Sequence, residues 1–112
     1  TMLSVDDATG IERTLGERPT RLVWFESPTN PALKVIDVAW LTSLAHRHGA
    51  LSVLDNTLAG LHHHGEFPVD VYVHSLTKYA AGHGDVMAGA IVGSSSLLRR
   101  MREDAVHPGP VL

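Results

Sequence analysis

Short apolar runs of strand-forming residues, separated by helical patterns, constrain the fold more than any other feature of this sequence. The runs cover residues 21–25, 50–54, 69–74 and 87–92. Helical patterns cover residues 4–16, 37–48 and 97–104. Strands that alternate with helices predict an α/β fold with a parallel sheet and right-handed crossovers. The first run is typical of a strand buried on both faces.

Two of the expected helices have recognisable ends. Ser4 is the predicted N-cap of the first helix, which extends to about Gly16. Gly10 lies inside that helix, where it costs about 1 kcal/mol relative to alanine. Asp37 is the predicted N-cap of the second helix, and Gly49 suits the position just after its last turn.

Composition and charge exclude several classes of protein. The chain has 112 residues, a net charge of −3 and no cysteine. Its length suits one domain at most, and its charge gives no reason to expect nucleic acid or an anionic membrane as a partner. Disulfides and cysteine–zinc sites are excluded. The sequence shows neither an apolar run of about 20 residues nor a secretion signal, so we expect a cytoplasmic protein.

The two ends of the sequence suggest a piece of a longer polypeptide. The chain starts at Thr1 and stops at residues 107–112, in what we interpret as the middle of a connection. A natural, loosely ordered tail is the alternative.

Polar segments follow three of the expected strands. They cover residues 26–31, 55–57 and 75–78. In a parallel sheet the ligand site lies beyond the carboxyl ends of the strands. We therefore expect the three segments to meet at one edge of the sheet, which is a stronger argument than any one segment alone.

Lys78 is the most suggestive residue of these segments. It follows Ser75 and Thr77 at the end of the third run. A lysine amine can form a Schiff base with an aldehyde cofactor, and two hydroxyls can hold a phosphate on the same molecule. The alternatives are a solvated surface lysine, which is the fate of most lysines, and hydroxyls that serve only the turn.

The other two segments carry residues that suit the ring of such a cofactor. Asp55 can pair with a protonated pyridine nitrogen and make the ring an electron sink. Thr57 can help to orient the ring, and Asn30 can hydrogen-bond its phenolic oxygen. Glu26 can brace the loop that carries Asn30. Each of the four also has an ordinary alternative as a turn, loop or strand-end residue.

Histidines near the site give weaker signals. Residues 62–64 are all histidine, but adjacent loop residues rarely converge on one ion and no acidic cluster lies nearby. A metal site there is the less favoured alternative, and we predict none. His83 lies between two glycines that permit positive φ, and it either lines the edge of the site or serves the turn.

Four segments together resemble the Cys/Met metabolism (trans-sulfuration) family of pyridoxal-phosphate enzymes, which includes cystathionine γ-synthases, cystathionine and methionine γ-lyases and homoserine sulfhydrylases. The segments are Glu-Ser-Pro-Thr-Asn-Pro at 26–31, Leu-Asp-Asn-Thr at 54–57, Val-His-Ser-Leu-Thr-Lys-Tyr at 73–79 and Gly-His-Gly-Asp-Val-Met-Ala-Gly-Ala at 82–90. Their order and spacing cover nearly the whole chain.

The resemblance implies a fold and a set of cofactor contacts. The chain would be the central part of the large domain of a fold-type-I, aminotransferase-like enzyme, with residues 87–92 antiparallel to the other strands. Lys78 would be the Schiff-base lysine and the catalytic residue, and Asp55 the partner of the pyridine nitrogen. The implied contacts to pyridoxal phosphate are Asn30, Asp55, Thr57, Ser75, Thr77 and Lys78.

Several parts of the family's site have no counterpart in these 112 residues. They are the glycine-rich phosphate loop, the aromatic residue that stacks on the ring, the Tyr-x-Arg pair from a neighbouring subunit, and the C-terminal small domain with its carboxylate-binding arginine. Leu58 departs from the aromatic residue that many members have after Asp-Asn-Thr, which concerns the substrate subgroup.

The resemblance implies γ-elimination or γ-replacement on cystathionine, methionine or an O-acylhomoserine. The enzyme would act on an amino acid, without nucleic-acid or membrane partners, as a homotetramer built from two dimers. For the 112 residues alone, the alternative is a catalytically incompetent fragment that serves folding, assembly or weak cofactor binding. A dinucleotide enzyme is disfavoured because no G-x-G-x-x-G follows a strand.

Overall fold

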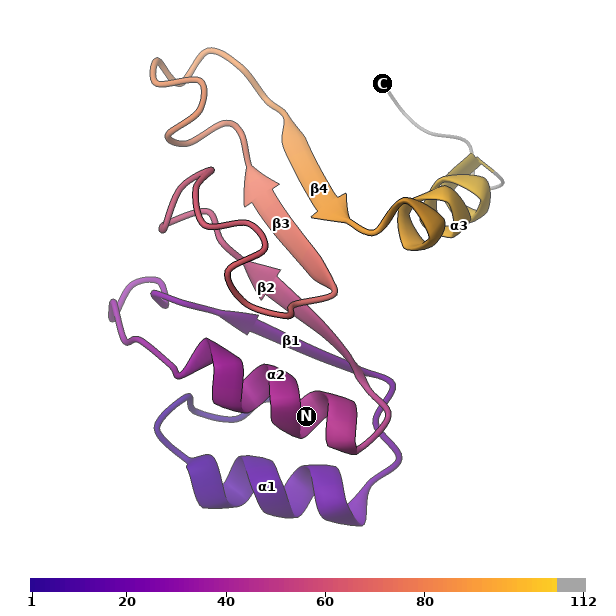
Figure 1. The fold of residues 1–112 in the computed structure, drawn as a ribbon. Coiled ribbons are helices and arrows are strands. Elements are labelled where there is room, and N and C mark those ends of the chain that lie inside the picture. The colour runs from indigo at the N-terminus through magenta and orange to yellow at the C-terminus, as the bar shows by residue number, and fades with distance from the viewer. Residues whose placement is uncertain (107–112) are drawn as a thin grey trace.

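The computed structural model describes residues 1–106, so the ending at residues 107–112 lies outside the described part. Helices and strands alternate in the first half of the chain (Figure 1). In chain order the elements are α1 (Ala8–Glu17), β1 (Leu22–Glu26), α2 (Val38–Arg47), β2 (Leu51–Asp55), β3 (Val71–Ser75), β4 (Gly89–Gly93) and α3 (Ser95–Val106).

The strands form one four-stranded sheet in the order β1-β2-β3-β4. The β1–β2 and β2–β3 pairs are parallel, whereas β4 is antiparallel to β3. In Figure 1 the arrowheads of β1, β2 and β3 accordingly point to one edge of the sheet, and that of β4 points to the other. The predicted α/β fold, mainly parallel with one antiparallel strand, is confirmed. Each strand begins one or two residues later than predicted.

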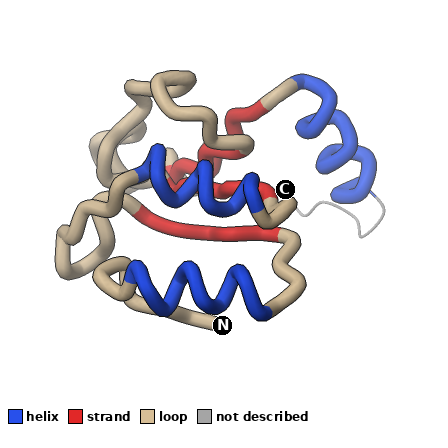
Figure 2. Tube along the Cα trace, turned by 60° about the horizontal axis from the view of Figure 1, so that its bottom comes forward, coloured by secondary structure: helices blue, strands red, loops and turns tan. Residues whose placement is uncertain are grey.

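One face of the sheet packs against α1 and α2. Phe25, Leu54 and Tyr72 are neighbours in register, so their side chains point to the same face. They form the core with the helices, and its buried members are Ile11, Leu15, Phe25, Ile36, Leu41, Leu44, Leu54 and Tyr72. Burying each large apolar side chain stabilises the fold by about 2 kcal/mol. Figures 1 and 2 show α3 beside β4, away from these two helices.

On the opposite face of the sheet, the apolar side chains of β1 are exposed, whereas Val53 of β2 and Val71 of β3 are buried. Leu22 is 48% exposed and Trp24 is 58% exposed, whereas Phe25 on the other face is 6% exposed. The prediction that the first strand is buried on both faces is therefore wrong for residues 1–106. β1 is an edge strand, and α1 and α2 cover only the face that carries Phe25.

The helix ends confirm one predicted cap and correct another. Asp37 caps α2, because its Oδ1 accepts a hydrogen bond from Trp40 N at 2.9 Å. The N-cap of α1 is Asp7 rather than Ser4. Asp7 Oδ1 accepts from Gly10 N at 2.9 Å, and Asp7 N itself donates to Ser4 O at 3.1 Å. Ser4 thus begins the turn at residues 4–7 that precedes α1.

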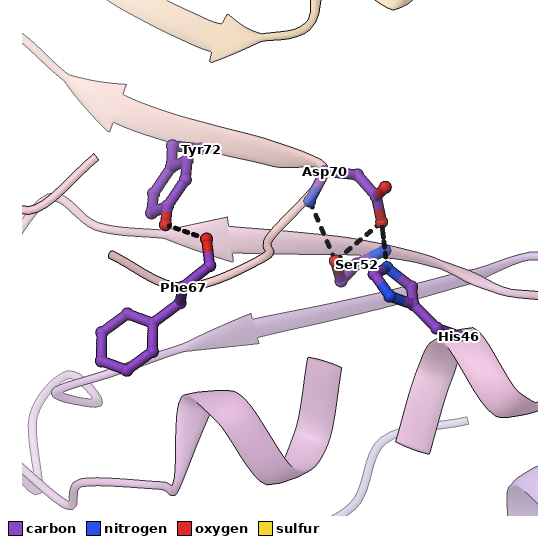
Figure 3. Close-up of polar contacts among 5 residues, drawn as sticks. All are labelled: His46, Ser52, Phe67, Asp70 and Tyr72. Atoms are coloured by element: carbon purple, nitrogen blue, oxygen red, sulfur yellow. Dashed lines mark hydrogen bonds and ion pairs between the residues drawn. The ribbon is translucent and has the colours of Figure 1, made fainter. Parts of the chain in front are cut away.

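A partly buried polar network joins α2 to the amino ends of β2 and β3 (Figure 3). The Ser52 hydroxyl donates to Asp70 Oδ2 at 2.8 Å and accepts from Asp70 N at 3.0 Å. His46 Nε2 lies 2.8 Å from the same carboxylate oxygen. Burial alone would raise the pKa of Asp70, but hydrogen bonds from Ser52 N, His46 and the Ser52 hydroxyl lower it below its ordinary value. The network fixes the relative position of β2 and β3.

None of the helices in residues 1–106 is long and apolar enough to cross a membrane.

Candidate functional site

A cavity of about 590 Å³ lies at the carboxyl ends of β1, β2 and β3. The polar segments that follow these strands supply its lining, which consists of Glu26, Asn30, Asp55, Thr57, Leu58, Ser75, Lys78, Tyr79 and Gly82. The structure thus brings the three segments together as the parallel sheet predicts. Of the six residues predicted to contact a cofactor, all except Thr77 line this cavity.

The register of the sheet explains why these side chains share one side. Glu26 is the register partner of Asp55, and Asp55 is the partner of Val73. Side chains alternate along a strand, so Ser75, two residues after Val73, points to the same face. This is the face opposite the helices. Two acidic side chains and one hydroxyl therefore meet at the end of three neighbouring strands.

Thr57 connects the ends of β2 and β3. Its backbone N donates to Asp55 Oδ1 at 3.0 Å, and its Oγ1 accepts from Ser75 N at 2.9 Å. The first bond orients the Asp55 carboxylate and uses one of its two oxygens. The second bond holds the start of the turn that leads to Lys78. Thr57 thereby positions two other lining residues, while its own O–H remains a donor.

The loop that carries Asn30 is braced from the sheet. Glu26 Oε2 accepts a hydrogen bond from Asn30 N at 2.9 Å. Of the two roles that the sequence left open for Glu26, the structure shows the contact with this loop. Two further hydrogen bonds join residues before Asn30 to residues after it. Thr29 N donates to Lys34 O at 2.8 Å, and the buried Ser27 Oγ accepts from Ile36 N at 3.3 Å.

A compact turn after β3 presents Lys78. Lys78 N donates to Ser75 O at 3.3 Å, and Gly82 N donates to Lys78 O at 3.1 Å. Gly82 has a φ of 74°, a conformation that glycine adopts without steric cost. The Lys78 residue is exposed to solvent at the cavity.

Thr77 points elsewhere. Its hydroxyl lies 3.4 Å from Ala88 O and accepts from Ala88 N at 3.3 Å. The side chain thus ties the turn to the segment before β4. The structure does not bring the two hydroxyls of Ser75 and Thr77 together at the cavity, and phosphate binding by Thr77 stays a prediction.

The sequence did not single out Leu58, Tyr79 or Gly82 as lining residues. Leu58 and Tyr79 each directly follow a predicted site residue, and Tyr79 and Gly82 belong to the family-like segments 73–79 and 82–90. Whether a residue after a strand lines the cavity depends on the path of the following turn, which residue type does not reveal.

Two of the histidines at 62–64 contact different residues. His63 Nδ1 pairs with Glu66 Oε1 at 2.6 Å, and His64 Nε2 lies 2.6 Å from His74 Nε2. His74 is 2% exposed. Burial and then the nearby His64 lower the pKa of His74, against a smaller opposing effect of Asp55. In residues 1–106 no three acidic or histidine side chains are placed to hold a metal ion.

The sheet places a lysine, a carboxylate and an amide at the carboxyl ends of its strands, where α/β sheets bind their ligands. The whole chain, residues 1–112, matches the family model for Cys/Met metabolism PLP-dependent enzymes. The chain belongs to this family, and the resemblance noted in its motifs is confirmed.

Individual relatives agree with this assignment. The L-methionine gamma-lyase of Pseudomonas putida is 46% identical over 85 residues, which are 74% of this chain and 21% of the relative. The canavanine gamma-lyase of Pseudomonas canavaninivorans is 39% identical over 109 residues, which are 95% of this chain and 27% of the relative. The chain thus spans about a quarter of the length of these relatives.

A solved structure supports the fold as well. The apo methionine gamma lyase from Micromonospora echinospora superimposes with a TM-score of 0.83 at 41% sequence identity. The match covers 93% of this chain and 30% of that one. The four-stranded sheet and its helices therefore correspond to part of a larger pyridoxal-phosphate enzyme structure.

Proposed function

We propose that residues 1–112 form the central part of the cofactor-binding large domain of a pyridoxal-phosphate enzyme. The enzyme carries out γ-elimination or γ-replacement on cystathionine, methionine or an O-acylhomoserine. The observation that carries this proposal is the cavity that brings Lys78, Asp55 and Asn30 together at the carboxyl ends of β1, β2 and β3. Family membership supports the cofactor, and the names of the relatives support the substrate class.

The residues of the cavity fit pyridoxal phosphate. Its volume of about 590 Å³ falls in the range of small-molecule sites, roughly 300–1,000 Å³. The Lys78 amine suits the aldehyde carbon, and the Asp55 carboxylate suits a protonated ring nitrogen. The Asn30 amide suits the phenolic oxygen, and the Ser75 hydroxyl suits the phosphate. The aldehyde, the ring nitrogen and the phenolic oxygen of the cofactor thus each have a chemically matched side chain in the lining, and the phosphate has one hydroxyl, that of Ser75.

The roles of these side chains follow from their chemistry. When bound, pyridoxal phosphate supplies an electron sink for negative charge at the substrate's α-carbon. Asp55 would keep the ring nitrogen protonated, and Thr57 N holds the Asp55 carboxylate in place at 3.0 Å. The Lys78 amine would hold the cofactor through its aldehyde carbon. The same amine would accept and return protons at the substrate's α- and β-carbons as a general base.

Lys78→Ala in the full-length protein tests the assignment. We expect loss of the visible absorbance band of lysine-bound cofactor, and loss of the borohydride-trapped adduct on the peptide that contains residue 78. Lys34→Ala is the matched control, because Lys34 is an exposed lysine that pairs with Asp6 outside the cavity. Retention of the band and the trapped adduct in the Lys78 variant would refute the proposal.

A second candidate concerns the 112 residues on their own, as an assembly module that binds cofactor weakly or not at all. The exposed Leu22 and Trp24 favour it, because an open apolar sheet face suits packing against further protein. Titration of the isolated chain with pyridoxal phosphate discriminates between the candidates. Saturable binding trapped by borohydride at Lys78 alone would indicate a retained site.

For the full-length protein we propose an assembly of two dimers. Analytical ultracentrifugation measures the mass of this assembly.

A further inference from the structure

Glu26 is a lining residue of the cavity that the proposed chemistry leaves without a role. It is the last residue of β1 and the register partner of Asp55, so its side chain lies on the cavity face of the sheet. Its Oε2 accepts from Asn30 N at 2.9 Å. The residue is partly buried, and its hydrogen bond joins an ionised carboxylate to a main-chain donor. Such charge-assisted bonds are roughly twice as strong as neutral ones.

The Asn30 loop has other hydrogen bonds, but they lie at different points. Thr29 Oγ1 accepts from Lys34 N at 3.0 Å, which closes the loop upon itself. Ser27 Oγ accepts from Ile36 N at 3.3 Å, which ties the end of the loop to its start. Among the hydrogen bonds of residues 1–106, the one that Asn30 N donates to Glu26 Oε2 connects the Asn30 main chain to the strand that ends at the cavity.

The hydrogen bond between Asn30 N and Glu26 Oε2 affects the direction of the Asn30 side chain. Asn30 is exposed to solvent. Its amide can meet a ligand atom reproducibly only if the backbone that carries it is fixed. A displacement of about 1 Å at a positioning group can lower a rate by roughly 10²-fold.

We propose that Glu26 is a positioning residue that holds the Asn30 main chain so that the side-chain amide donates to the phenolic oxygen of the cofactor. This inference rests on the proposed function. Glu26 acts through its hydrogen bond to Asn30 N and not through its negative charge beside Asp55. The hydrogen-bond role and the charge role predict different behaviour for Gln and Leu at position 26, because glutamine keeps the acceptor oxygen and leucine does not.

The first test is the pH midpoint of the cofactor's visible absorbance in the full-length protein. An amide that donates to the ionised phenolic oxygen lowers that midpoint. Glu26→Leu should raise the midpoint by roughly half to one pH unit, the size expected for one weakened hydrogen bond. Glu26→Gln should stay near the wild-type value. In an Asn30→Ala background, Glu26→Leu should cause no further shift of the midpoint, because Glu26 acts on the cofactor only through the Asn30 amide.

The second test needs no cofactor. Hydrogen exchange of the Asn30 amide in the cofactor-free protein should be roughly fivefold to tenfold faster in Glu26→Leu, and near wild type in Glu26→Gln. Thr29→Val is the matched control, because it removes a hydrogen bond of the same loop outside the cavity lining. When Thr29→Val is included in the first test, it should leave the absorbance midpoint of the cofactor unchanged.

Three results would overturn the inference. They are an unchanged midpoint in Glu26→Leu, an equal shift in the Asn30→Ala background, and a Gln variant as perturbed as the Leu variant. A wild-type protein without any lysine-bound cofactor band would refute the proposed function instead. In that case the exchange rate of the Asn30 amide still decides whether Glu26 holds the loop.

Discussion

Removal of the Ser52 hydroxyl should destabilise the protein by about 2.5–3 kcal/mol. Ser52 is fully buried, at 0% exposure. In Ser52→Ala the protein loses the bond to Asp70 Oδ2 at 2.8 Å and the bond from Asp70 N at 3.0 Å. A hydrogen bond to a charged group contributes roughly 1.5–3 kcal/mol and a neutral one about 1 kcal/mol. The lower half of the summed range applies, because the Asp70 side chain is 26% exposed and keeps the hydrogen bond from Ser52 N.

Urea unfolding monitored by circular dichroism measures this loss. The control is Ser43→Ala, an exposed position on α2, for which we expect a change within about 0.5 kcal/mol. A loss below about 1 kcal/mol in Ser52→Ala would refute the reasoning that the network stabilises the amino ends of β2 and β3. An NMR titration of Asp70 gives a second readout. Because the Ser52 hydroxyl helps to lower the pKa of Asp70, its removal should move that pKa upward toward 3.8.

Two further predictions concern α1 and the buried histidine. Gly10→Ala should stabilise the protein much less than Gly16→Ala, which should add about 1 kcal/mol. A Cβ at Gly10 overlaps the Asp7 carboxylate that caps the helix, whereas one at Gly16 meets open space; equal thermal shifts for the two variants would contradict this. Burial and His64 hold the pKa of His74 below 6.5. The unfolded chain therefore binds the proton first, and the unfolding free energy should fall as pH drops from about 6.5 until it passes the folded-state pKa. Urea titrations across this range should show a weaker decline in His74→Phe, and an unchanged slope would count against the assignment.

The sequence predicted those parts of the fold that depend on local signals. Asp37 and Gly49 mark the ends of α2 because a side-chain acceptor and a residue free to adopt positive φ act within one helical turn. The cap of α1 was misassigned because Ser4 and Asp7 are both good N-cap residues. Asp7 is the cap in the structure because its carboxylate accepts from Gly10 N, and Gly10 has no Cβ that would overlap the carboxylate.

The sequence predicted the position of those site residues that lie at the ends of strands. Asp55 and Ser75 reach one cavity because parallel strands deliver their carboxyl ends to a common edge. Thr77 lies only two residues beyond Ser75, yet its hydroxyl contacts the Ala88 backbone instead. Strand alternation stops where the turn begins, so residue spacing no longer tells which way a side chain points.

The sequence by itself determined the α/β class, the family and the candidate lysine, because apolar periodicity, caps and contiguous motifs are properties of neighbouring residues. Only the tertiary structure decided which residues meet across the chain. The Ser52–Asp70 bonds, the His64–His74 contact and the cavity lining join residues from different elements. The exposed outer face of β1 was likewise set by tertiary packing. These features depend on strand register and loop path, which are fixed by the packing of the whole sheet and not by any single segment.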